Sequence, residues 1–260
     1  MRFSIALGIS LLLYLNAQCQ PADRIKEFRF PLGDDVISYF TTIKGEYRKA
    51  VFINLHENER TSLDAAKSVL PAYTDYRLVE LRYRGQRNLE FKQRGRTFSV
   101  DPNRMFTKDG IRLTLERNSD EVRPYAVRMV NRHAKKLKRN FFNQAGIVIA
   151  LHNNTEANYS VLGYGPGGPD APDVEELHIN PDHDPDNFFY TTDHGFFQYA
   201  RSKGFNAVLQ KSGNVKDDGS LSVYCGLRKI PYINIEAQHG HLTEQESMTR
   251  VVLDYLRDKP

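Results

Sequence analysis

The sequence has 260 residues, enough for one large domain or two small ones and for a core that needs no disulfide bonds. Hydrophobic residues make up 40% and charged residues 26% of the chain, close to globular averages, which excludes a disordered, collagen-like or coiled-coil protein. The net charge of +4 is too small and too evenly spread to indicate a nucleic-acid partner.

An apolar run near the start has the pattern of a secretory signal peptide. Arg2 precedes an apolar stretch at residues 5–15, and small or polar residues follow. A stretch of about 11 residues fits a signal peptide, whereas roughly 20 are needed to span a bilayer. We therefore expect residues 1–17 to be removed, and the protein to be periplasmic or secreted without stable membrane insertion. Acylation of Cys19 after cleavage would instead give a lipid anchor, but the residues before it fit that motif poorly.

Strands and helices alternate along the remaining residues, 18–260. The residue patterns predict strands at 50–55, 78–83, 89–91, 97–100, 146–151, 207–210, 221–224 and 232–236, and helices at 62–70, 123–142, 193–203 and 244–257. Residues 163–187, rich in Gly, Pro and Asp, predict a long surface loop. Because parallel strands need crossover connections, we expect a single α/β domain, a three-layer α/β/α sandwich with a mixed, mainly parallel sheet.

The remaining cysteine, Cys225, follows the predicted strand at 221–224. A small buried residue is the simplest interpretation, and with Cys19 it makes no disulfide framework. The sequence has no Gly-rich phosphate loop and no G-x-S-x-G motif, so neither nucleotide binding nor the commonest serine hydrolase chemistry is expected.

Polar side chains that suit a metal ion follow two of the predicted buried strands. His56 and Glu59 come directly after the strand at 50–55, and His152 follows the strand at 146–151. Open α/β sheets bind their ligands beyond the strand ends, so we expect these side chains to converge. Two imidazoles and one carboxylate are a common ligand set for catalytic zinc.

Further motifs extend this pattern along the chain. H-x-x-E is followed by D-P-N-R-M-F at residues 101–106, by the strand that ends in His152, and by a late strand that ends in Glu236. This order resembles the zinc carboxypeptidase and aspartoacylase (succinylglutamate desuccinylase) superfamily. The resemblance implies a carboxypeptidase A-like fold and one Zn²⁺ per chain, held by His56, Glu59 and His152.

The resemblance also implies roles for other residues. Asn103 and Arg104 would bind a substrate carboxylate, and Glu236 would be the general base. The superfamily also uses an arginine that stabilises the oxyanion and a tyrosine that closes over the substrate. Arg87 and Tyr224 are the candidates for these two roles, and a solvated strand face is the alternative interpretation of Arg87.

The sequence thus predicts an exported zinc-dependent hydrolase that cleaves an amide bond next to a free carboxylate. A metallocarboxypeptidase acting on peptides, including cell-wall peptides, is the main interpretation. Ninety-two residues lie between Glu59 and His152, a short spacing that is nearer to the aspartoacylase branch or to compact bacterial cell-wall carboxypeptidases. An amidohydrolase acting on N-acyl amino acids is therefore an alternative, and a metal-free carboxylate-binding protein is a second one.

Overall fold

The computed structural model describes residues 23–45, 50–156, 159–213 and 215–258. The expected signal peptide and the candidate lipid anchor at Cys19 lie outside these residues. Among the residues described, no helix is long and apolar enough to span a membrane.

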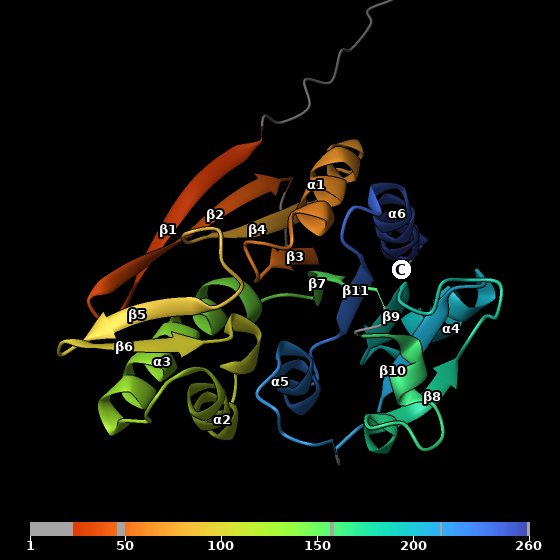
Figure 1. Ribbon diagram of the computed structural model, residues 1–260. Coiled ribbons are helices and arrows are strands. Elements are labelled where there is room, and N and C mark those ends of the chain that lie inside the picture. Colours follow the sequence, from red (N-terminus) through yellow and green to blue (C-terminus); the bar gives the residue numbers. More distant parts are fainter. Residues whose placement is uncertain (1–22, 46–49, 157–158, 214, 259–260) are drawn as a thin grey trace, which may run out of the picture.

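A nine-stranded mixed sheet forms the centre of the protein, in the order β1-β2-β4-β3-β7-β11-β9-β10-β8. The strands are β1 (Arg24–Leu32), β2 (Asp35–Lys44), β3 (Ala50–Asn54), β4 (Tyr76–Arg82), β7 (Ile147–Asn154), β8 (Val174–His178), β9 (Phe188–Thr191), β10 (Asn206–Gln210) and β11 (Tyr232–Gln238). The central strands β4, β3, β7 and β11 are parallel, whereas β1, β2 and β8 pair antiparallel at the edges. A separate hairpin, β5 (Leu89–Gln93) and β6 (Arg96–Val100), lies beside the sheet (Figure 1).

Helices cover both faces of the sheet, which confirms the predicted α/β/α class. The helices are α1 (Arg60–Val69), α2 (Lys108–Asn118), α3 (Pro124–Leu137), α4 (His194–Ser202), α5 (Leu221–Arg228) and α6 (Leu242–Asp258). One buried cluster contains apolar side chains of α2, α3 and α5, and the other contains side chains of α1, α4 and α6. Figure 1 shows these two groups on opposite sides of the central strands.

One predicted strand is wrong. Residues 221–224 begin the helix α5, because Ser220 caps its first turn by accepting a hydrogen bond from the Val223 amide. All five residues of the run L-S-V-Y-C are buried, so the start of this short helix is enclosed on every side. Cys225 therefore lies inside α5, where burial raises the pKa of its thiol and makes it a poor nucleophile.

Several elements were not predicted. The hairpin of β1 and β2, helix α2 and strand β9 have no counterpart in the sequence-based assignment, and β8 lies inside the predicted loop at 163–187. The strands that matter for the site agree with prediction. β3 and β7 are fully buried, and Glu236 of β11 lies directly opposite His152 of β7.

A buried histidine links α3 to the β1–β2 hairpin. His133 is inaccessible, its Nδ1 lies 3.4 Å from the Pro31 carbonyl oxygen, and its Nε2 lies 2.8 Å from the Tyr39 hydroxyl. A carbonyl can only accept, so Nδ1 donates to Pro31, and when the ring is neutral Nε2 accepts from the Tyr39 hydroxyl. Burial lowers the pKa of His133 from 6.5 to about 4.

We expect this histidine to make folding sensitive to acid. Between pH 6.5 and pH 4 the unfolded chain binds the proton and the folded chain does not, so stability falls as the pH drops through that range. Urea unfolding of the wild type and of His133→Gln at pH 7 and pH 5 measures the effect. The variant should lose about 2 kcal/mol less between these pH values than the wild type does. Equal losses in the two proteins would contradict the assignment, and exposed His183→Gln serves as the control.

Candidate active site

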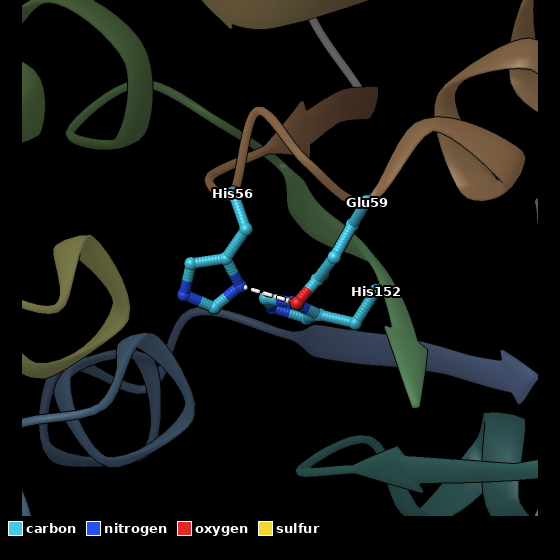
Figure 2. Close-up of side chains that lie close together, drawn as sticks. All are labelled: His56, Glu59 and His152. Carbon is cyan, nitrogen blue, oxygen red and sulfur yellow. Dashed lines mark hydrogen bonds and ion pairs between the residues drawn. The ribbon is translucent and has the colours of Figure 1, made fainter. Parts of the chain in front are cut away.

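Three side chains with metal-binding atoms converge where β3, α1 and β7 meet (Figure 2). His56 Nδ1 lies 2.8 Å from Glu59 Oε1 and 3.2 Å from His152 Nδ1. His152 Nδ1 lies 2.8 Å from Glu59 Oε2. All three residues are buried. The structure thus brings together the three predicted ligands, although His152 is 93 residues from Glu59 and 96 residues from His56 in the sequence.

A tight turn places His56 and Glu59 side by side. β3 ends at Asn54, and the Glu59 amide donates to the His56 carbonyl at 3.0 Å. The Asn54 side chain holds the turn by donating to the Glu59 carbonyl at 3.2 Å. α1 then begins directly after Glu59. The two residues between His56 and Glu59 are therefore the turn itself, which is why the H-x-x-E spacing brings the two side chains to one point.

The donor set fits a zinc ion. With bonds of about 2.0–2.1 Å in tetrahedral geometry, ligand atoms around zinc are roughly 3.3 Å apart, close to the separations between these nitrogen and oxygen atoms. The outer nitrogen of His56, Nε2, lies 2.8 Å from Asp101 Oδ1, so this carboxylate fixes the ring with Nδ1 free to bind a metal. Imidazole nitrogens and carboxylate oxygens are common zinc ligands, so the donor atoms of the site suit the predicted cofactor.

Charges within the cluster stabilise one another. Burial tends to raise the pKa of Glu59, but His56 and His152 hold it well below the usual range. Burial likewise tends to lower the pKa of His56, but Glu59 and Asp101 raise it to about 9. Asp101 is also held below its usual pKa by His56, against the effect of its own burial. The carboxylates of the cluster are therefore ionised, and the proton on His56 supplies the positive charge that balances them. A bound metal ion would supply that charge in place of the proton.

Arg87 lies beside this cluster, although its side chain remains half exposed. Its guanidinium donates a hydrogen bond to Glu59, and Nη2 lies 3.7 Å from Asp101 Oδ2. The residue also lines the adjoining cavity. The solvated-face interpretation therefore does not describe its surroundings, since the arginine faces two buried carboxylates at the site.

Asn103 and Arg104 lie on the short helical turn that follows Asp101. The Asp101 side chain caps this turn by accepting from the Asn103 amide at 2.8 Å. The Asn103 side chain accepts from the Leu221 amide at 3.1 Å, which ties the turn to α5. Arg104 Nε lies 3.5 Å from Asp218 Oδ2. Both predicted carboxylate-binding residues line the same cavity as the histidines.

Glu236 faces this cavity from β11. It is buried, and burial raises the pKa of its carboxyl group. Asn234, on the same face of the strand, donates to Glu236 Oε1 at 2.9 Å. A carboxyl group with a raised pKa beside a candidate metal site is suited to accept and return a proton near neutral pH.

Tyr224 lies elsewhere. Its hydroxyl donates to Asn143 at 3.2 Å, its ring packs under Lys138, and it is not among the residues that line the cavity. The structure therefore does not bring Tyr224 to the site. Four other tyrosines line the cavity: Tyr159, Tyr164, Tyr190 and Tyr232. No motif marks them in the sequence, although Tyr164 lies in the predicted surface loop at 163–187.

The cavity has a volume of about 360 Å³ and joins all the site residues except Glu59 and Tyr224. It is lined by His56, Arg87, Asn103, Arg104, His152 and Glu236 together with tyrosines, serines, asparagines and aspartates. The candidate metal ligands His56 and His152 and the candidate carboxylate-binding residue Arg104 thus border one cavity.

Comparison with solved structures gives similar folds. An aspartoacylase family protein from Mesorhizobium loti is 15% identical, with a TM-score of 0.49 over 92% of this chain and 68% of the other. A succinylglutamate desuccinylase/aspartoacylase from Rhodobacter sphaeroides is 12% identical, with a TM-score of 0.49 over 90% and 66%. The ectoine utilization protein from Ruegeria pomeroyi is 12% identical, with a TM-score of 0.46 over 91% and 68%.

The first two of these solved structures are described as aspartoacylase or succinylglutamate desuccinylase family proteins. The chain spans about two thirds of the length of each. No family model matches the sequence, and no curated protein matches it.

Metal content tests the cluster. Purified protein equilibrated with zinc should hold about one zinc per chain, measured by mass spectrometry, because three buried ligand atoms converge on one point. His152→Ala should hold less than a tenth as much, and removal of zinc by a chelator should lower the Tm of the wild type but not that of His152→Ala. His239→Ala, an exposed histidine beyond β11, is the control. A wild type that takes up no zinc would show that the cluster is not a metal site.

Proposed function

We propose that the protein is a zinc-dependent hydrolase that cleaves an amide bond next to a free carboxylate, most simply as a carboxypeptidase acting on peptides. One observation carries the proposal: two histidines of the His56, Glu59 and His152 cluster, a buried carboxyl group and an arginine all border one cavity. Each of the three parts supplies something that this reaction needs.

Arg104 and Asn103 supply the substrate contact. A guanidinium can bind both oxygens of a carboxylate at once, which fixes the orientation as well as the position of the substrate. Arg104 is paired with Asp218 at 3.5 Å, a distance long enough for a substrate carboxylate to compete for the guanidinium. Under this proposal, the amide bond next to that carboxylate would lie in the cavity that the histidines and Glu236 also border.

Proton transfer is the task of Glu236. Zinc, when bound by the three ligands, supplies a Lewis acid that lowers the pKa of water and polarises a carbonyl. Because Oε1 of Glu236 accepts a hydrogen bond from Asn234, Oε2 is the oxygen that is available to take the proton of the attacking water. The same carboxyl group then returns the proton to the leaving amine. Arg87 lies close enough to donate to the oxygen that gains negative charge.

Peptides are proposed because of the expected export, which would place the enzyme in the periplasm or outside the cell. N-acyl amino acids present the same amide and carboxylate, so they are the alternative substrates to test beside peptides. A lipid anchor at Cys19 is not needed for this function.

Paired substrates with a free or an amidated C-terminus test the role of Arg104. The wild type should hydrolyse the free carboxylate at least about 100-fold faster in kcat/KM, because the Arg104 guanidinium can form a charge-assisted pair with a carboxylate but not with a neutral amide. Arg104→Gln should lose most of this preference, mainly through a higher KM for the free acid. Lys108→Gln, on the exposed side of α2, serves as the control. Equal hydrolysis of both forms by the wild type would contradict the proposal.

Glu236→Gln tests the general base. The amide keeps the size of the carboxyl group but cannot take up a proton, so kcat should fall about 10²–10⁴-fold while KM and zinc content change little. Kinetics and metal analysis on one preparation give both readouts. Unchanged kcat would assign the proton transfer to another residue.

A further inference from the structure

One acidic side chain of the ligand turn contacts a different part of the chain. Glu57 directly follows His56 in the turn that carries two of the candidate metal ligands (Figure 2). Its Oε2 accepts a hydrogen bond from the Tyr83 amide and another, at 2.7 Å, from the Gly85 amide. Both donors belong to residues 83–88, which connect β4 to β5 and are called here the β4–β5 segment. Hydrogen bonds to an ionised acceptor are stronger than those between neutral groups, so Glu57 ties this segment firmly to the ligand turn.

The β4–β5 segment bends sharply at the point where Glu57 holds it. Arg84 and Gly85 both have left-handed main-chain conformations, with φ angles of 59° and 66°. This conformation is unfavourable for a residue with a Cβ atom, so Arg84 needs contacts that keep it there. The two amides that Glu57 binds lie on either side of Arg84, and the Arg84 side chain pairs with Asp35 at 2.9 Å. Glu57 therefore stabilises the bend itself.

The bend determines where Arg87 lies. Arg87 comes two residues after Gly85, and its side chain is 52% exposed, so close packing does not fix its position. Its guanidinium nevertheless donates to Glu59 and lies 3.7 Å from Asp101 Oδ2, and it lines the cavity. A long side chain on an unanchored segment would sample many other conformations. The anchor at Gly85 keeps the guanidinium within reach of the cavity.

The metal ligands have supports of their own. Asn54 holds the ligand turn by donating to the Glu59 carbonyl, and the Asn153 amide donates to Glu59 Oε2 at 3.1 Å. Neither contact involves Glu57. Loss of the Glu57 contacts should therefore leave the ligands in place and release only the segment that carries Arg87.

We propose that Glu57 is a positioning residue for Arg87, because it anchors the β4–β5 segment to the turn that carries the metal ligands. Glu57 contacts neither substrate nor metal in this account and transfers no proton. Its task needs an acceptor oxygen at the correct reach, so a glutamine can replace it and a shorter side chain cannot. The inference rests on the proposed hydrolase function and adds the residue that positions its oxyanion donor.

Variants that separate reach from charge test the inference. Glu57→Gln keeps an acceptor oxygen at the same distance, so its kcat should stay within about 3-fold of the wild type. Glu57→Asp keeps the charge but is one methylene shorter, and Glu57→Ala has no acceptor. Both should lower kcat at least about 10-fold, with KM changed less than about 2-fold and zinc content unchanged, because only the donor to the developing oxyanion is misplaced. Asn58→Ala, an exposed position in the same turn, is the control and should match the wild type.

A double-mutant cycle shows whether Glu57 acts through Arg87. Arg87→Ala removes the guanidinium, so adding Glu57→Asp to it should lower kcat by less than about 2-fold further. A further loss as large as in the wild-type background would overturn the inference. Loss of zinc from Glu57→Asp, or a Glu57→Gln as impaired as Glu57→Asp, would also overturn it and leave the hydrolase in place.

Structural readouts decide the inference without activity. In Glu57→Asp the Gly85 amide should exchange with solvent at least about 10-fold faster than in the wild type and in Glu57→Gln. A crystal structure of Glu57→Asp should show the Arg87 guanidinium displaced from Glu59 and the ligand histidines unmoved. An unmoved Arg87 would overturn the inference. A wild type that hydrolyses none of the peptides or N-acyl amino acids would count against the proposed function, and these two readouts would still decide whether Glu57 positions Arg87.

Discussion

A carboxylate with almost no access to water is the interaction on which this site depends. Glu59 is 1% exposed, yet its two oxygens face His56, His152 and Arg87 at hydrogen-bonding distance. Removing a charge from water is costly unless opposite charge and hydrogen bonds replace the lost hydration. The surrounding positive groups meet that requirement in the structure, and a divalent cation would meet it more completely.

Asn153, next to His152, holds the Glu59 side chain and links it to three elements of the fold. The Asn153 amide donates to Glu59 Oε2 at 3.1 Å, and the Asn153 side chain accepts from the Ser62 amide of α1 at 2.9 Å. The same side chain donates to the Ala237 carbonyl of β11 at 3.2 Å. These contacts join α1, β7 and β11, so the parallel register that sets His152 opposite Glu236 also sets the ligand cluster beside the proton acceptor. Little of this arrangement depends on surface loops.

Much of this site could be predicted because its residues follow strands with strong apolar patterns. β3 and β7 are buried on both faces, so their sequences are continuous in apolar residues and the polar residues at their ends are conspicuous. Once the strands are parallel neighbours, the ends must meet. H-x-x-E and D-x-N-R are local motifs, and their geometry comes from turns of a few residues that the sequence determines directly.

Other parts depend on contacts that no local pattern contains. Residues 221–224 have the composition of a strand, and the Ser220 cap together with packing against the sheet decides in favour of a helix. Tyr159, in the segment after β7, and Tyr164, in the predicted loop, both line the cavity, whereas the selected Tyr224 turns toward Asn143. Among the described residues Asn234 Oδ1 is buried without a hydrogen-bond partner, which is a property of three-dimensional packing that no sequence pattern indicates.

The most direct measurement of the central claim is a crystal structure of zinc-treated protein with anomalous diffraction recorded on both sides of the zinc edge. We expect one zinc peak, bonded to Nδ1 of His56, Nδ1 of His152 and the carboxylate of Glu59 at about 2.0–2.2 Å. Arg87 should then have moved away from Glu59. A zinc peak only at exposed histidines, with the buried cluster unchanged, would contradict the claim.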